Sequence, residues 1–157
     1  MKKVILPLLL LTLALFGCKK DQALNDSNDY LIFGHFFGEC GGPNCIEIFK
    51  LSQTELMEDT LDHYPSTTDF YEGQYVLLSQ SKFDQTKDLP TFFPTALLNE
   101  TATVIGQPDA GDWGGLYIEY HINGIRKFWL IDLMKTNVPA QYHAFIDKVT
   151  QKIAQLE

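Results

Sequence analysis

Two cysteines, Cys40 and Cys45, have the spacing that most directly permits chemistry. Four turn-forming residues, Gly-Gly-Pro-Asn, separate them. A turn there would bring the two Cα atoms within disulfide range. Their thiolates could instead bind zinc or copper with an imidazole from His35 or His63, although zinc sites usually show closer cysteine spacing. A redox-active pair is disfavoured, because Glu39 would raise a neighbouring thiol pKa.

An acidic, glycine-rich loop follows later in the chain, with the sequence PDAGDWGG over residues 108–115. The carboxylates of Asp109 and Asp112 could bind calcium, but the spacing of an EF-hand is absent. Aspartates in such loops more often accept hydrogen bonds from their own backbone. Trp113 in this loop is either an exposed recognition residue or a lid over the core.

Three polar side chains, Tyr117, Glu119 and His121, alternate along one expected strand. They could line a polar pocket, but alternation of this kind favours a solvated sheet face. No Gly-x-Ser-x-Gly, phosphate-loop or His-Glu-x-x-His motif occurs in the chain. We therefore assign no catalytic residue, no metal ligand and no cofactor.

The chain begins with a positively charged and then apolar stretch. Lys2 and Lys3 precede thirteen mostly apolar residues, Val4 to Phe16, and Lys19 and Lys20 follow soon afterwards. A membrane-spanning helix needs roughly 20 apolar residues. The pattern therefore predicts a secretory signal over residues 1–17 rather than a retained membrane span.

The end of this stretch, Leu15-Phe16-Gly17-Cys18, resembles the lipobox of bacterial lipoproteins. Phe16 stands where a smaller residue is more common in that family. The resemblance implies that Cys18 receives a diacylglycerol and that signal peptidase II cuts before it. It also implies acylation of the new amine, commonly with palmitate. Several acyl chains on one cysteine hold a protein at a membrane, whereas one chain binds only marginally.

Lipidation of Cys18 leaves Cys40 and Cys45 as an even pair in an exported chain, which predicts a disulfide between them. The chain as a whole resembles small uncharacterised cell-envelope lipoproteins of Gram-negative bacteria, especially of Bacteroidota type. Lys19 directly after the cysteine mildly favours the outer membrane, because aspartate at that position marks retention in the inner membrane of enterobacteria. The expected location is the cell envelope, on the periplasmic or the surface side.

Length and charge bound the rest of the chain. Among 157 residues, 12 are basic and 20 acidic, and removal of residues 1–17 leaves a net charge of −10. Nucleic acid is disfavoured as a partner, because no basic patch is present to displace phosphate counterions. The polar segment 18–29 reads as a lipidated flexible tether, and 30–157 as a single globular domain.

The expected elements give an α+β fold. Strands are predicted over 30–37, 45–51, 55–60, 74–79, 101–105, 116–122 and 125–133, with short helical pieces over 81–100 broken by two prolines. Asn123-Gly124 predicts a type I′ hairpin turn. A helix from Pro139 to Gln155, capped by Asn137, has one apolar stripe that includes Phe145. The predicted fold is an antiparallel sheet of five to seven strands with this helix on one face.

The hypothesis that follows is a membrane-anchored envelope lipoprotein with a small non-catalytic domain that binds another envelope protein or a glycan. One alternative is a metal-binding or thiol-disulfide protein that uses Cys40 and Cys45. Another is a hydrolase whose site residues are dispersed along the chain, since such sites often leave no local motif.

Overall fold

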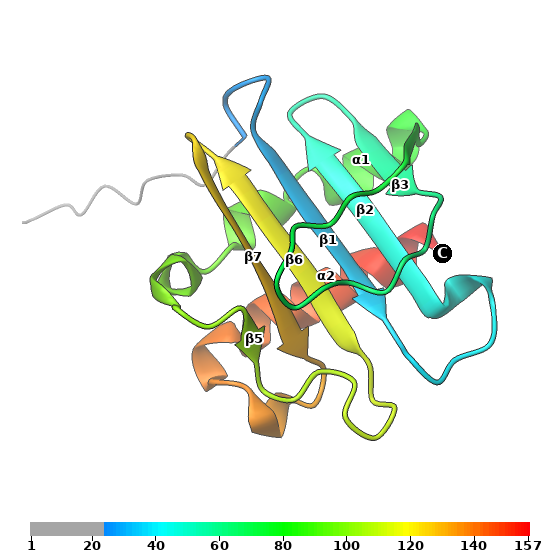
Figure 1. The fold of residues 1–157 in the computed structure, drawn as a ribbon. Coiled ribbons are helices and arrows are strands. Elements are labelled where there is room, and N and C mark those ends of the chain that lie inside the picture. Colours follow the sequence, from blue (N-terminus) through cyan, green and yellow to red (C-terminus); the bar gives the residue numbers. More distant parts are fainter. Residues whose placement is uncertain (1–23) are drawn as a thin grey trace, which may run out of the picture.

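Seven strands form one sheet in residues 24–157, the part of the chain that the computed structural model describes (Figure 1). Their order is β4-β3-β2-β1-β6-β7-β5. All neighbours are antiparallel except β5 and β7, which are parallel. The strands are β1 (Tyr30–Phe36), β2 (Ile46–Ser52), β3 (Leu56–Asp59), β4 (Tyr75–Leu77), β5 (Val104–Ile105), β6 (Gly115–Ile122) and β7 (Ile125–Asp132). The predicted α+β fold is confirmed, with one parallel pair added to the expected antiparallel sheet.

Strand β1 lies between β2 and β6, so both of its edges are paired. Phe33 pairs with Phe49 on one side and with Ile118 on the other. Gly34 is required in this strand, because a Cβ there would lie 2.1 Å from the backbone oxygen of Glu47. The nearly continuous apolarity of this segment therefore reports a central strand, as expected.

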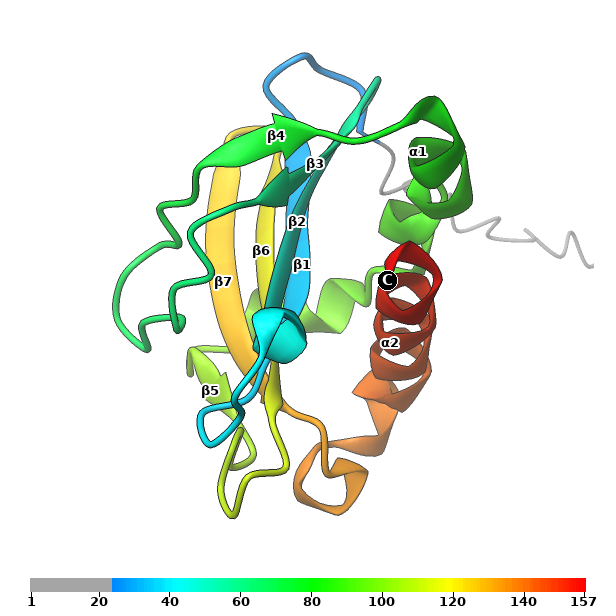
Figure 2. The same cartoon turned by 90° about the vertical axis from the view of Figure 1, so that its right-hand side faces the viewer.

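The helices lie on one face of the sheet (Figure 2). The α-helices are α1 (Gln80–Thr86) and α2 (His143–Leu156), and short 3-10 turns are η1 (Pro43–Cys45), η2 (Leu89–Phe92), η3 (Thr95–Asn99), η4 (Lys135–Asn137) and η5 (Ala140–Tyr142). The apolar stripe of α2, which includes Phe145 and Val149, is buried. This packing confirms the expected C-terminal helix.

The beginning of that helix was predicted incorrectly. The chain makes the 3-10 turn η5 first, and α2 starts only at His143, without a capping side chain. Asn137 does not cap it, because α2 begins six residues further on; the Asn137 side chain instead donates from Nδ2 to Asp132 Oδ2 at 2.8 Å.

The other face of the sheet is covered by residues 60–74, the segment between β3 and β4, which crosses it without regular secondary structure (Figure 2). Phe70 and Tyr71 of this segment pack on Tyr117 and Phe128. A second, smaller apolar cluster therefore lies opposite the helices, and the sheet is buried on both sides.

Two local features fix the ends of the strands near Leu24. Asn123 and Gly124 have φ values of 55° and 75°, as the predicted hairpin turn requires. The stretch from Leu24 to Asp29, assigned to the tether in the sequence analysis, packs on the domain. Leu24 is buried, and Asp29 accepts hydrogen bonds from the backbone of Asn25, Asp26 and Asn123.

Replacement of Phe145 by aspartate tests the docking of α2. Phe145 is 3% exposed and packs edge-on against Phe93 with ring centroids 5.6 Å apart. Phe145→Asp should lower the free energy of unfolding by about 3–5 kcal/mol, because it removes an aromatic ring and buries an unpaired charge. Urea denaturation measures the change. Gln151→Asp, on the exposed side of α2, is the control, and equal stability of the two variants would show that α2 is not docked.

Candidate functional site

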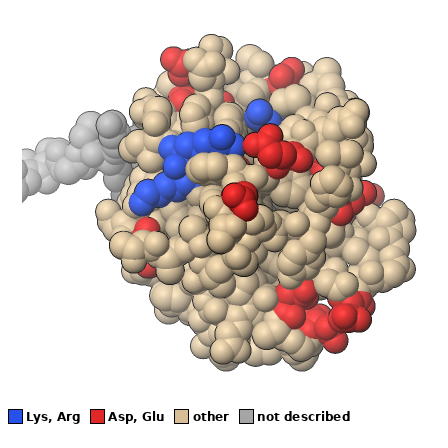
Figure 3. All heavy atoms as spheres, in the orientation of Figure 1, with Lys and Arg blue, Asp and Glu red and all other residues tan. Residues whose placement is uncertain are grey.

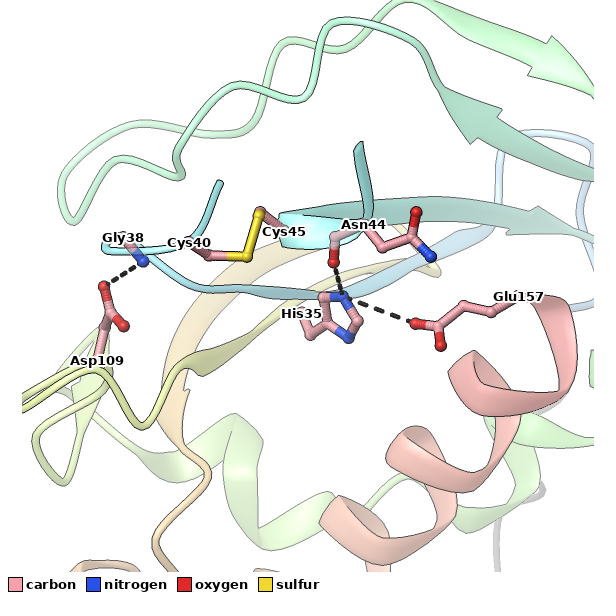
Figure 4. The surroundings of a disulfide bond; sticks show 7 residues. All are labelled: His35, Gly38, Cys40, Asn44, Cys45, Asp109 and Glu157. Atoms are coloured by element: carbon pink, nitrogen blue, oxygen red, sulfur yellow. Dashed lines mark hydrogen bonds and ion pairs between the residues drawn. A yellow bond between two sulfur atoms is a disulfide. The ribbon is translucent and has the colours of Figure 1, made fainter. Parts of the chain in front are cut away.

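The predicted disulfide between Cys40 and Cys45 is present, in the loop that joins β1 to β2 (Figure 4). The two Cα atoms are 5.6 Å apart. The loop is closed at its base by Phe37, whose N–H donates to the Cys45 carbonyl at 2.9 Å. In this state neither sulfur is a thiolate, so neither is available as a metal ligand.

The histidines considered with these cysteines have other partners. His35 Nε2 lies 3.1 Å from the Asn44 carbonyl oxygen and 3.8 Å from Glu157 Oε1 (Figure 4). His63 lies in the segment 60–74, which covers the other face of the sheet, whereas the disulfide follows β1 in a separate loop; the His63 backbone N–H donates to the Tyr71 hydroxyl. Within residues 24–157, no group of three or more His, Cys, Asp and Glu side chains is placed to hold a metal ion.

Asp109 joins three loops at the same end of the sheet. Its Oδ2 accepts hydrogen bonds from the Gly38 N–H at 2.8 Å, in the disulfide loop, and from the Tyr64 hydroxyl at 2.9 Å. Its Oδ1 accepts one from the Gly114 N–H at 3.2 Å within its own loop. The expected self-capping is therefore present, and the same carboxylate also binds two loops that are distant in sequence.

The backbone of this loop is held in an uncommon conformation. Asp109, Gly111, Asp112 and Gly114 all have φ values between 62° and 72°. For the two aspartates this left-handed region is costly, and such strain persists only when surrounding contacts impose it. A Cβ on Gly114 would lie 2.2 Å from the ring of Phe37, so that position also depends on glycine for space. The loop is thus fixed in one shape.

Trp113 is the side chain that this loop presents. It is 61% exposed, which identifies it as an exposed residue rather than a lid over the core. Tyr64 lies near this loop, because its hydroxyl donates to Asp109, and its ring packs on Phe36 with centroids 5.0 Å apart. The Tyr64 side chain is 50% exposed. Burial, followed by the hydrogen bond to Asp109, raises the pKa of Tyr64 to about 12. We call residues 37–45, Tyr64 and 108–114 the distal loop surface.

This surface lies at the end of the sheet remote from Leu24. Strand β1 begins close to Leu24 and runs to Phe36, and the disulfide loop follows it, while the loop 108–114 directly precedes β6 (Figure 1). A seven-residue strand separates the two ends by about 23 Å. The sequence indicated Asp109 and Trp113 but not Tyr64 or Gly38, which carry no local motif.

A second polar cluster is buried beneath residues 60–74. Glu119 has 0% exposure, so the predicted solvated face is wrong at this position. Its carboxylate accepts hydrogen bonds from Tyr30 and Tyr117 hydroxyls at 2.9 and 2.8 Å, and from Arg126 Nε at 2.8 Å. The Arg126 guanidinium lies 3.9 Å from the centre of the Phe70 ring. The covering segment hides this face, and the arginine supplies the neutralising charge.

The neighbouring carboxylate, Asp59, is equally occupied. It accepts a hydrogen bond from the Tyr71 hydroxyl at 2.7 Å and from the backbone of Leu61 and Asp62. Tyr71 N–H in turn donates to Tyr117 oxygen at 3.0 Å. Burial raises the pKa of Tyr117 far above its usual range, so it remains a neutral donor. This network anchors the covering segment, and its groups are committed to one another.

A pair of glutamates lies on the helix side of the sheet. Glu47 on β2 and Glu58 on β3 share a hydrogen bond, and burial, followed by this bond and the repulsion of Glu58, raises the pKa of Glu47 to about 7. Asp62 and Glu157 add further negative charge near Glu47. The alternation of residues along each strand did not predict this pair, because its two glutamates lie on different strands.

Comparison with known proteins adds no relative: no family model, no curated protein and no solved structure matches the chain. In residues 24–157 no helix is long and apolar enough to cross a bilayer.

Thiol titration tests the state of Cys40 and Cys45. In unreduced protein carrying Cys18→Ser, we expect no reactive thiol, and two after reduction in denaturant. Reduction should cost about 2 kcal/mol of stability, since the closed loop is short. Two reactive thiols before reduction, or stoichiometric zinc or copper, would support the thiol or metal alternative instead.

Glu47→Gln tests the glutamate pair. Folding raises the pKa of Glu47 from 4.5 to about 7, so the folded state binds more protons between these values and its stability falls as pH rises. The variant should match the wild type below pH 4.5 and exceed it above pH 7, by about 1 kcal/mol because the pair is partly solvated. Urea denaturation at pH 4 and pH 8 gives the difference. Glu39→Gln removes the same charge from an exposed position as control, and an equal gain there would contradict the assignment.

Proposed function

We propose that this protein is a lipid-anchored component of the bacterial cell envelope and that its domain is a binding module rather than an enzyme. A partner would bind it at the distal loop surface. The lipid would be carried by Cys18, which lies outside the described residues. The observation that carries the binding role is Trp113, exposed on a loop whose shape is fixed by the hydrogen bonds of Asp109 and by four left-handed residues, of which Asp109 is one.

The exposure of Trp113 and the fixed shape of its loop favour a role in binding a partner, for an energetic reason. Large aromatic side chains dominate the free energy of many binding interfaces, and a loop that is already ordered loses little entropy when it binds. Asp109 supplies that order by linking Trp113's loop to the disulfide loop and to Tyr64. A flexible loop would have to be ordered at the expense of affinity.

The position of the surface suits a tethered protein. A lipid on Cys18 would hold the chain at the end where Leu24 enters the domain, whereas the distal loop surface lies at the opposite end of β1 (Figure 1). The Cys40–Cys45 disulfide supports an oxidising compartment outside the cytoplasm. The partner would then be an envelope protein or a glycan that approaches from the side away from the membrane.

The buried carboxylates give less support to catalysis. Glu119 is closed off from solvent and saturated by three donors, and Asp59 is held by Tyr71 and its own loop backbone. A general acid or base must reach a substrate proton, which neither arrangement allows without moving residues 60–74.

The anchor and the binding surface are tested separately. Intact-mass analysis of the native protein should show a chain that starts at Cys18 with acyl chains attached, and Cys18→Ala should release it from membranes. An uncut or unmodified chain would contradict the anchor.

For the surface, a photo-crosslinking residue at the exposed Ala110, which lies in the same loop outside its left-handed positions, should capture a defined envelope component, and digestion with protease or glycosidase shows its class. Trp113→Ala should reduce capture by at least tenfold. Phe92→Ala, which removes another exposed aromatic ring, one in η2 that lies against Lys148 of α2, is the control and should leave capture unchanged. Equal capture by both variants would contradict the role of Trp113.

A further inference from the structure

The distal loop surface carries charge of one sign only. It contains three acidic side chains, Glu39, Asp109 and Asp112, and no lysine, arginine or histidine. Glu39 and Asp112 are exposed, and no ion pair within residues 24–157 involves any of the three acids. Three carboxylates and no basic group give this surface a net charge of −3 around the exposed Trp113.

Backbone contacts between the two loops hold these acidic residues near one another. Asp109 Oδ2 accepts a hydrogen bond from the N–H of Gly38, the residue directly before Glu39 (Figure 4). The Asp112 N–H donates to the Asp109 carbonyl at 3.3 Å, which places both aspartates in one turn. The donors to the Asp109 carboxylate are two backbone N–H groups and a tyrosine hydroxyl, all neutral, so its charge is not cancelled. Acidic side chains gather at the lower right of Figure 3, where these loops lie in Figure 1.

Two exposed aromatic rings lie among these acids. The Trp113 ring lies beside Gly111, since a Cβ on that glycine would be 3.6 Å from Trp113 Cδ1. The Tyr64 ring lies beside Gly38 in the same way, at 3.5 Å from Cε2. The face of an aromatic ring attracts a cation, and it does so most strongly in tryptophan. The rings and the carboxylates are different kinds of group, and both favour a positively charged partner.

The arrangement suits an organic cation rather than a metal ion. Within residues 24–157 no group of three or more His, Cys, Asp and Glu side chains is placed to hold a metal, so the acids of this surface do not converge on one point. A guanidinium is planar, so it stacks on an aromatic ring while its N–H groups donate to carboxylates. An ammonium group is a compact charge that lacks this planar contact. Arginine is therefore the side chain that uses both features of the surface.

The same charge disfavours the other kinds of envelope partner. Lipids and glycans that carry phosphate or carboxylate groups are repelled by the acids of the distal loop surface. A neutral glycan would stack on Trp113 but would gain no attraction from the net charge. A basic protein segment is the partner whose charge complements this surface.

We propose that the distal loop surface binds an arginine-bearing segment of a partner protein, with a guanidinium on the Trp113 ring and its N–H groups paired to Asp112 and Glu39. This inference rests on the proposed function, because it names the partner of the same surface. It favours a protein over a glycan as that partner.

The test uses the detergent-solubilised protein and a blocked, fluorescently labelled hexapeptide of alternating glycine and arginine. Fluorescence anisotropy at about 0.15 M salt should show saturable binding, since adjoining charges are only partly screened there. The same peptide with citrulline in place of arginine keeps nearly the same shape without the charge, and it should bind about tenfold more weakly. Cellotetraose, a neutral glycan, should not displace the arginine peptide.

Variants locate the site on the protein. Trp113→Ala should weaken binding of the arginine peptide about tenfold, and Asp112→Asn, which suits the left-handed backbone there, about threefold. Glu55→Gln is the matched control and should leave the affinity unchanged. It removes one charge from the turn between β2 and β3, at the end of the sheet where Ser52 pairs with Tyr30.

Equal binding of the arginine and citrulline peptides would overturn this inference. Equal losses in Asp112→Asn and Glu55→Gln would do so as well, because they would reveal a general attraction to an acidic protein. Displacement by cellotetraose would assign the surface to a glycan and overturn this inference alone, since Trp113 would still bind the partner. Unchanged photo-capture from envelopes in Trp113→Ala would instead count against the proposed function itself.

Discussion

The structure depends on the neutralisation of one buried charge. Glu119 lies in β6, an interior strand of the sheet, without solvent contact. A lone carboxylate there would cost several kcal/mol, but two tyrosine hydroxyls and Arg126 satisfy it. Only with that charge satisfied can residues 60–74 cover the face, and Phe70 completes the arrangement by lying against the guanidinium. The covered face is therefore a polar network enclosed by aromatic rings.

The same covering segment connects the interior of the sheet to the distal loops. Tyr71 joins it to Asp59 and Tyr117 beneath the sheet's centre, while Tyr64 joins it to Asp109 at the distal loops. The shape of the loop that presents Trp113 thus rests on contacts from three separate parts of the chain. A binding surface built in this way is pre-organised by the packing of the domain rather than by its own short sequence.

The features that the sequence predicted well are local ones. Asn123-Gly124 specifies its turn from two residues, and the apolar stripe with Phe145 specifies the docked face of α2. The burial of Glu119 was not predictable in this way, since its cover comes from a segment with no periodic pattern. The partners of Asp109 lie 45 and 71 positions away, and β5 joins β7 in parallel through two residues only. Such contacts are decided by the tertiary arrangement, which single-strand patterns do not record.

The central position of β1 has a consequence for how the chain becomes folded. Its first neighbour, β2, follows immediately, but its second neighbour begins only at Gly115. Until that late segment arrives, an apolar strand with one unsatisfied side is exposed, and such strands readily pair with other chains. If the chain emerges from its N-terminus first, the free edge of β1 would therefore stay open to pairing with other chains until residues 115–122 have emerged. This exposure would end when β6 pairs with the second edge of β1, the strand that emerged first.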